Sequence, residues 1–352
     1  MHDSTSDLRI RAQIPLVAPA VLAGELPLPD AGAILIARTR REIAGILAGT
    51  DDRLLVVVGP CSIHDPVAAV EYAERLRDAM RLHPADLLLV MRVYFEKPRT
   101  VTGWKGLIND PGLDDTFQIS HGLRLARHLM LDIVALGVPV GTEFLDTTLG
   151  QYYADLVAWG AIGARTVESQ VHRELASGLS MPVGFKNRTD GDIQVAIDAI
   201  RTARATHWFP SLTRDGAPAI LGTAGNEHTH LVLRGGTRGP NYSREHVRAV
   251  VEMLEKNSLP PRLMIDCSHA NSGKDAARQP AVAADLAAQL AAGERAIAAV
   301  MLESNLLGGT QDYRARPLVH GRSITDACLS WEQTLPVLAI LAEGVRARRK
   351  VK

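Results

Sequence analysis

The chain has 352 residues, a formal net charge of zero at pH 7, three cysteines and an apolar fraction of 46%. A neutral chain has no long-range field that favours nucleic acid. Three cysteines cannot form the disulfide framework of a secreted domain, so we expect a reducing, cytoplasmic setting. No apolar run approaches the roughly 18 residues of a membrane span, and the first residues do not resemble a signal peptide, so we expect no membrane partner.

Eight short apolar runs alternate with amphipathic segments along the chain. The runs are continuous and show no alternation of apolar and polar residues, which is typical of strands covered on both faces. They begin at Leu54, Asp86, Val138, Ala161, Pro182, His230, Arg262 and Ala296. This alternation predicts a closed (β/α)8 barrel, with an open doubly wound sheet as the alternative.

Helix signals occupy the segments between these runs. Asp65 is placed to cap a helix whose first residue is Pro66. A later helix is expected to open near Pro280 and to stop at Gly293. The last helix is expected to start at Pro336, because proline is tolerated at the first helical position.

Two regions lie outside this alternation. Residues 1–50 read as an arm followed by one helix, and their exposed apolar residues are expected to pack on a neighbouring subunit. The runs HWFPSL and APAIL flank an Asp-Gly pair, which predicts an inserted β-hairpin at about 207–224. We therefore expect an N-terminal oligomer or regulatory segment (1–50) before a catalytic barrel (51–352).

Cationic side chains follow most of the predicted strands. In a (β/α)8 barrel the strand ends meet at one mouth, where active sites lie. Each such residue alone is more often an ordinary rim residue, but six strong cations at one mouth favour phosphorylated substrates. The six are Arg92, Lys97, Arg99, Arg165, Lys186 and Arg234.

Four further residues at the same mouth can bind a metal ion. They supply a thiolate, an imidazole and two carboxylates: Cys61, His269, Glu303 and Asp326. That mixture suits a first-row divalent metal better than Mg or Ca, which prefer oxygen ligands alone. The spacing matches no short metal-binding motif, so the prediction depends on the barrel to bring the four together. A metal there would polarise a carbonyl oxygen or activate water.

Nine long strings of the sequence resemble those of type I 3-deoxy-D-arabino-heptulosonate-7-phosphate (DAHP) synthases, which open the shikimate pathway. Among them are GPCSIHDP, MRVYFEKPRT, WKGLINDP, WGAIGART, PVGFKN, IDCSHANS and GRSITDAC. The resemblance covers essentially the whole chain. It implies a (β/α)8 barrel that condenses phosphoenolpyruvate with erythrose 4-phosphate and uses one divalent metal ion (Mn, Fe, Co or Zn).

The resemblance also implies the site residues. The metal ligands fall on Cys61, His269, Glu303 and Asp326. The phosphoenolpyruvate site falls on Arg92, Lys97, Glu143, Gly163, Ala164, Arg165, Lys186 and Arg234. The erythrose 4-phosphate site falls on Lys97, Pro98, Arg99, Thr100 and Asp326. Lys97 reaches both substrates in this scheme and is a candidate acid, and Cys61 and His269 are counted with it as catalytic.

The chain departs from the family pattern in a few places. Arg188 stands where glycine is usual, and Asn305 stands where histidine is expected. Neither change removes a predicted ligand. Arg188 raises the question of a changed backbone, since glycine adopts conformations that arginine does not.

Members of this family are commonly inhibited by one aromatic amino acid, which implies an effector site formed by the arm and the hairpin. The matching positions are Asp7, Gln151, Leu175, Leu179, Ser180, Phe209, Ser211 and Leu221. Ser211 favours phenylalanine as the effector, with tryptophan next, because tyrosine-responsive members tend to carry glycine there. A homodimer or homotetramer is expected.

Three other functions compete with this interpretation. Lys186 ends an apolar strand and could serve a Schiff-base aldolase, since desolvation activates a lysine. A related synthase could join phosphoenolpyruvate to a different sugar phosphate. A metal-binding regulatory protein without activity is the third. Borohydride trapping, chelation and a phosphate-release assay distinguish them.

Overall fold

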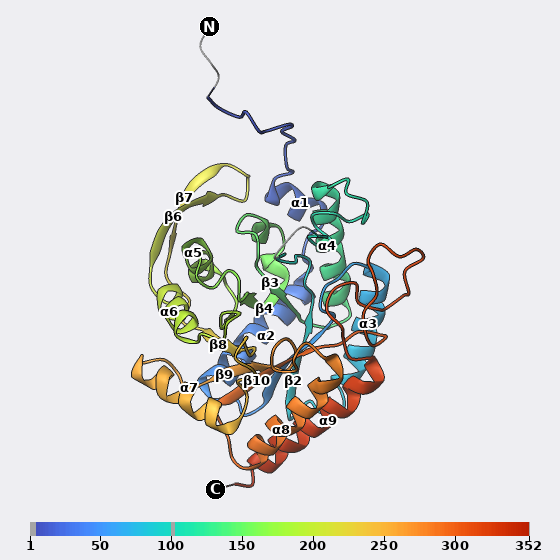
Figure 1. The fold of residues 1–352 in the computed structure, drawn as a ribbon. Coiled ribbons are helices and arrows are strands. Elements are labelled where there is room, and N and C mark those ends of the chain that lie inside the picture. The colour runs from blue at the N-terminus through green and yellow to red at the C-terminus, as the bar shows by residue number, and fades with distance from the viewer. Residues whose placement is uncertain (1–4, 100–102, 352) are drawn as a thin grey trace.

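Eight parallel strands close into a barrel in the computed structural model, which describes residues 5–99 and 103–351 (Figure 1). In chain order they are β1 (Leu54–Gly59), β2 (Leu87–Arg92), β3 (Val140–Glu143), β4 (Val157–Ile162), β5 (Val183–Lys186), β8 (Thr229–Leu233), β9 (Leu263–Asp266) and β10 (Ile297–Glu303). The ring closes where β1 pairs with β10, with Gly59 opposite Glu303. The barrel prediction is confirmed, and the open sheet is wrong.

The barrel strands bury side chains on both faces, as their uninterrupted apolar sequences require. In β1, Leu55 and Val57 belong to the cluster that fills the barrel, together with Trp159 of β4. The same cluster includes Ile43 and Leu47 of α2 (Asp30–Ala48). Helix α2 therefore closes the amino-terminal end of the barrel and leaves the opposite end open for a site.

Seven helices among the described residues surround the barrel. They are α3 (Pro66–Ala79), α4 (Ile119–Ala135), α5 (Gln170–Gly178), α6 (Gln194–Ala203), α7 (Arg244–Lys256), α8 (Gln279–Ala291) and α9 (Trp331–Arg348). The Asp65 carboxylate accepts hydrogen bonds from the backbone N–H groups of Val67 and Ala68, which confirms the predicted cap. Gly293 ends the α8 segment with a φ of +98°, a conformation that glycine adopts readily. No helix of the described ranges is long and apolar enough to cross a membrane.

Two predicted boundaries are wrong. Helix α9 begins at Trp331 rather than at Pro336, because Ser330 and Gln333 form a capping box that fixes an earlier start. Pro336 lies inside the helix and leaves one hydrogen bond unmade. Strand β4 begins at Val157 rather than at Ala161, since the buried Trp159 belongs to the strand and fills the barrel interior.

The N-terminal segment and the hairpin lie beside each other outside the barrel (Figure 1). Strands β6 (His207–Leu212) and β7 (Pro218–Thr223) form the predicted antiparallel pair. A short helix that was not predicted, α1 (Pro19–Glu25), follows the arm, and the backbone N–H of Ala20 donates to the carbonyl of Arg214 in the hairpin turn. Three 3-10 helices complete the described elements: η1 (Leu149–Tyr152), η2 (Ala154–Leu156) and η3 (Ala276–Arg278).

Candidate active site

A cavity of about 610 Å³ opens at the carboxyl ends of the barrel strands. All six predicted cations line it: Arg92, Lys97, Arg99, Arg165, Lys186 and Arg234. Six other predicted site residues also line it: Pro98, Glu143, Gly163, Ala164, His269 and Asp326. Thr100 lies outside the described residues. The fold thus brings together in one cavity residues that are far apart in the sequence.

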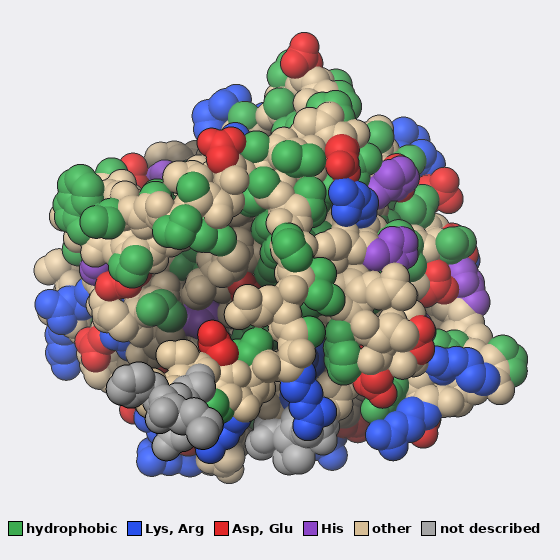
Figure 2. All heavy atoms as spheres, turned by 90° about the horizontal axis from the view of Figure 1, so that it is seen from above, with side chains coloured by type: hydrophobic (Ala, Val, Ile, Leu, Met, Phe, Trp, Pro, Cys, Tyr) green, Lys and Arg blue, Asp and Glu red, His purple; other side chains and the backbone are tan. Residues whose placement is uncertain are grey.

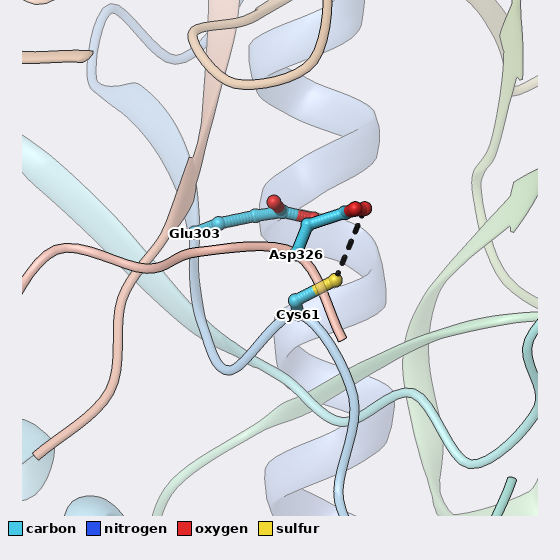
Figure 3. A group of neighbouring side chains, drawn as sticks. All are labelled: Cys61, Glu303 and Asp326. Atoms are coloured by element: carbon cyan, nitrogen blue, oxygen red, sulfur yellow. Dashed lines mark hydrogen bonds between the residues drawn. The ribbon is translucent and has the colours of Figure 1, made fainter. Parts of the chain in front are cut away.

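Three of the four predicted metal ligands form a compact group beside this cavity (Figure 3). One ligand atom each of Cys61, Glu303 and Asp326 lies within 4.8 Å of the other two. The Sγ atom of Cys61 is 3.6 Å from Oδ2 of Asp326. Three separate segments supply them: the loop after β1, the end of β10 and the loop before α9.

His269 lies at the edge of this group and is not part of its compact set. Its Nε2 atom is 3.9 Å from Oε1 of Glu303, and its Nδ1 atom is 2.9 Å from Oδ2 of Asp266. The contact with Asp266 orients the imidazole ring, as carboxylates do behind many metal-bound histidines. The ring therefore presents Nε2 on the side of Glu303, 3.9 Å from its Oε1 atom.

Glu303 is held in place from two sides. Arg92 donates from Nη2 to Oε1 of Glu303 at 3.0 Å, and both side chains are almost fully buried. The side-chain amide of Gln279 bonds to both the backbone N–H and the carbonyl of Glu303, each at 2.9 Å. Glu303 is thus held in one position, which would lower the entropic cost of binding a metal.

Cys61 lies in an environment that disfavours its thiolate. Burial raises the pKa of the Cys61 thiol, and the charge of Glu303 raises it further. The nearest opposing cation is Lys97, whose Nζ atom is 3.0 Å from Sγ. Burial works to lower the pKa of Lys97, but the charges of Cys61 and Glu303 outweigh it and the pKa is raised. A buried thiol that is surrounded by carboxylates fits a divalent cation, because such an ion stabilises the thiolate directly.

Asp266 is a residue of the candidate site that the sequence interpretation missed. It is fully buried at the end of β9, where it accepts from Nζ of Lys186 at 3.1 Å as well as contacting His269. Although burial opposes it, the charges of His269 and Lys186 hold the pKa of Asp266 well below its usual range. The signal was visible, since the string IDCSH places a carboxylate at a strand end.

Other cavity-lining residues also escaped the sequence interpretation. They are Thr189, Gly236, Thr237, Ala270, Lys274 and Thr325. All lie in loops after strands, where sequence alone does not say which side chain turns inward. Tyr94 was also missed, although its ring lies 3.6 Å below the guanidinium carbon of Arg92.

The two departures from the family pattern leave the site intact. Arg188 has an ordinary negative φ, and its guanidinium pairs with Glu168 at 2.7 Å and with Asp190 at 2.5 Å. The left-handed conformation in this turn is taken by Gly191, with a φ of +102°. Asn305 is buried, and its side-chain oxygen accepts the backbone N–H of Leu306 at 2.8 Å.

Most predicted effector residues lie around the hairpin. Phe209 pairs with Leu221 across β6 and β7, and both are half-buried on the inner face, as is Ser211. Nε2 of Gln151 donates to the carbonyl of Leu212 at 3.5 Å. Leu175 and Leu179 pack against the core nearby, whereas Ser180 and Asp7 are exposed.

A closed (β/α)8 barrel with six cations and a thiol–carboxylate group at its mouth defines a class of barrel enzymes that act on anionic substrates. The comparisons identify the family within that class. The chain belongs to the DAHP synthetase I family, whose model matches residues 33–339.

Individual relatives resemble the chain over nearly its full length. It is 56% identical to the Phe-sensitive phospho-2-dehydro-3-deoxyheptonate aldolase of Escherichia coli, covering 99% of this chain and 100% of that protein. It is 53% identical to the Trp-sensitive enzyme of Enterobacter agglomerans, with 98% and 99% covered. A solved structure of the same aldolase from Francisella tularensis has a TM-score of 0.95 and 51% identity, covering 97% of this chain and 99% of that chain.

Proposed function

We propose that the protein condenses phosphoenolpyruvate with erythrose 4-phosphate and water, giving DAHP and inorganic phosphate with the help of one divalent metal ion. The observation that carries this proposal is the convergence of six cations and the Cys61–Glu303–Asp326 group on one cavity. Relatives named as phospho-2-dehydro-3-deoxyheptonate aldolases match 98–99% of the chain, which supports the proposal.

The burial of the cations suggests where each substrate binds. Arg92, Lys186 and Arg234 are at most 8% exposed, so a small, highly charged molecule such as phosphoenolpyruvate suits this inner region. Arg165 and Glu143 line the same cavity. Burial lowers the pKa of Arg234, because the charged guanidinium has lost solvation. A bound anion would stabilise that charge.

The second substrate is assigned to the outer region. Arg99 is exposed at the rim, and its Nε atom donates to the carbonyl of Trp104 at 2.8 Å, which fixes the direction of the guanidinium. Pro98 and Asp326 line the same cavity as Arg99 and Lys97. An aldose phosphate can place its phosphate against Arg99 while its aldehyde points inward to the metal ligands.

The residues at the metal group fit a first-row divalent cation. Thiolate, imidazole and carboxylate donors together match Mn, Fe, Co or Zn better than Mg or Ca. Such an ion, when bound, would supply Lewis-acid polarisation of the aldehyde carbonyl. Cys61, Glu303 and Asp326 would hold it, with His269 completing the set by its Nε2 atom.

Lys97 is the proposed proton donor. Its Nζ atom is 3.0 Å from Sγ of Cys61, and Lys97 lines the same cavity as Arg99. From there its ammonium can protonate the oxygen that becomes a hydroxyl as the new carbon–carbon bond forms. The surrounding cations orient two anions that would otherwise repel, and they stabilise charge as phosphate departs.

The contacts of Lys186 argue against the Schiff-base alternative. Its Nζ atom lies 3.1 Å from Oδ2 of the buried Asp266, so the nitrogen that would have to attack a carbonyl is already held by a carboxylate. Borohydride in the presence of substrate is therefore expected to leave the protein unmodified.

We further propose that an aromatic amino acid, with phenylalanine favoured, inhibits the enzyme at the hairpin, and that residues 1–50 serve regulation and assembly. Apolar arm residues are strongly exposed, with Leu8 at 74% and Ile14 at 86%. Figure 2 shows apolar side chains across the centre of the face seen from above, with charged side chains mostly around its edge. A second copy of the chain would cover such a surface, giving a homodimer or homotetramer.

One assay tests the proposed activity. The purified protein is stripped of metal, and phosphate release is followed with both substrates before and after Mn, Fe, Co or Zn is returned. Activity that needs both substrates and a returned metal supports the proposal. Activity with a different aldose phosphate but not with erythrose 4-phosphate would assign the chain to a related synthase.

A further inference from the structure

A second cavity, of about 190 Å³, lies at the amino-terminal end of the barrel, opposite the catalytic mouth. Three segments form it: the end of α2, the stretch from α6 to the start of β8, and the turn between α7 and β9. Its apolar lining is made of side chains that are at most 7% exposed: Leu47, Ile200, Leu231, Leu254 and Leu259. The cavity shares no residue with the catalytic cavity or with the hairpin.

The guanidinium group of Arg204, which lines this cavity, has one buried nitrogen without a hydrogen-bond partner among the described residues. Arg204 follows the last turn of α6, and that nitrogen is its Nη1 atom. Leaving a buried charged donor unsatisfied is costly, so natural proteins rarely keep one without a function or a ligand. A carboxylate is the usual complement of a guanidinium.

The other charged residues around the cavity also favour a carboxylate ligand. Arg262 lines the same cavity, and burial together with the charge of Arg295 lowers its pKa. At the rim, the carboxylate of Glu227 lies 3.7 Å from Nε2 of His228 and is 80% exposed. The cavity thus combines an apolar interior, two guanidinium groups and one peripheral carboxylate.

The cavity is also connected to the barrel interior. His230 lines it, and Nε1 of Trp159 donates to Nε2 of His230 at 3.2 Å within the core. Burial lowers the pKa of His230 to about 4, so the ring is neutral near pH 7 and can accept this hydrogen bond. Occupancy of the cavity should therefore change the fluorescence of Trp159.

We propose that this cavity is a binding site for a small apolar carboxylate, held by Arg204 and Arg262 with its hydrocarbon part among Leu47, Ile200 and Leu254. Two kinds of ligand combine a carboxylate with an apolar group. One is a simple branched-chain or aromatic acid, and the other is an α-amino acid with an apolar side chain, whose ammonium would pair with Glu227. The proposal does not depend on the catalytic activity.

Direct binding measurements on the full-length protein test it. The probes are 4-methylpentanoate and L-leucine. Calorimetry and tryptophan fluorescence measure their binding. Arg204→Met removes the guanidinium but keeps an apolar side chain of similar reach, and Arg201→Met is the matched control, since Arg201 is exposed on the same helix. We expect saturable binding that weakens at least about tenfold in Arg204→Met and stays unchanged in Arg201→Met.

Comparing the two probes shows whether the cavity prefers a simple carboxylic acid or an α-amino acid. Binding of L-leucine that is lost in Glu227→Gln, with weaker binding of 4-methylpentanoate, identifies an amino-acid site, whereas equal binding of both identifies a general carboxylate site. No saturable binding of either probe overturns the proposal, as does binding that Arg204→Met leaves unchanged. Equal binding of inorganic sulfate would also overturn it, because the apolar lining would then have no role. Far-UV circular dichroism and basal turnover confirm that both arginine variants are folded.

Discussion

The Nζ atom of Lys97 lies 3.0 Å from the Sγ atom of Cys61. The proposed proton donor and a proposed metal ligand are thus in direct contact, although 35 residues separate them in the chain. Any change in the charge of one is felt by the other, because the two atoms are in contact and solvent screens them poorly at the buried Cys61 and the half-buried Lys97. This contact links the metal group to the proton transfer.

Replacing Lys97 with methionine should remove the proton donor and leave the cavity shape nearly intact. We expect kcat to fall about 10²-fold or more, the usual contribution of a general acid. Steady-state kinetics with both substrates measure it. Lys105→Met is the control, since Lys105 is exposed nearby, and it should keep kcat within about twofold. A Lys97→Met enzyme with normal kcat would exclude Lys97 as the acid.

Cys61→Ser should weaken metal binding. The change removes the sulfur donor from the group with Glu303 and Asp326, and we expect a loss of affinity of at least about tenfold. Competition with a chelator, followed by elemental analysis of the protein, measures it. Cys328→Ser is the control, because Cys328 is equally buried near Asp326 but lies outside the group. If both variants retain metal alike, the sulfur is not a ligand.

Arg99→Ala should impair the outer substrate region selectively. Loss of the guanidinium should lower kcat/KM for erythrose 4-phosphate by about 2–4 kcal/mol in transition-state stabilisation. The KM for phosphoenolpyruvate should change little, since the inner cations remain. Arg81→Ala, at a strongly exposed arginine on the surface, serves as the control. Unchanged kinetics for the sugar phosphate in Arg99→Ala would overturn the substrate assignment.

Glu96 should make the stability of the fold depend on pH. The pKa of Glu96 is raised to about 7, mainly by burial and also by the charges of Asp146 and Glu143, while hydrogen bonds from the Asp146 N–H and the Tyr153 hydroxyl oppose the shift. The folded protein therefore keeps this proton up to about pH 7, whereas the unfolded chain loses it near 4.5. Between these values the unfolded state binds fewer protons, so rising pH lowers the free energy of unfolding.

Glu96→Gln removes that titration. Relative to the natural protein, the variant should gain up to about 3 kcal/mol in free energy of unfolding between pH 4.5 and pH 8. Urea unfolding at several pH values measures the difference. Glu74→Gln, at an exposed glutamate, should follow the natural protein at every pH. Parallel pH profiles for Glu96→Gln and the natural protein would show that Glu96 is not protonated in the fold.

Ser211→Phe should abolish feedback inhibition and spare catalysis. Ser211 is half-buried on the inner face of the hairpin, so a phenyl ring there would fill the space proposed for the effector. We expect inhibition by phenylalanine to weaken at least about tenfold. Ile220→Phe places a ring on the opposite, exposed face and should leave inhibition unchanged. Normal inhibition in Ser211→Phe would locate the effector elsewhere.

Much of the site could be predicted from the sequence because chemistry in a barrel follows each strand. The runs that begin at Leu54 and Ala296 marked their strands, and the residues after them, Cys61 and Glu303, proved to be neighbours. The prediction was less accurate where side-chain contacts decide the outcome. Asp266, for example, is part of the site because it contacts Lys186 at the end of β5 and His269 in the loop after β9.

The sequence by itself determined the local elements and the types of residue at the strand ends, since apolar periodicity and capping act over a few residues. Only the tertiary structure decided which distant groups meet. The closure of β1 on β10 brings Cys61 to Glu303, and α2 covers the other end and lines an apolar cavity together with Arg204. Those contacts depend on the register and closure of the whole ring, which no short stretch of sequence encodes.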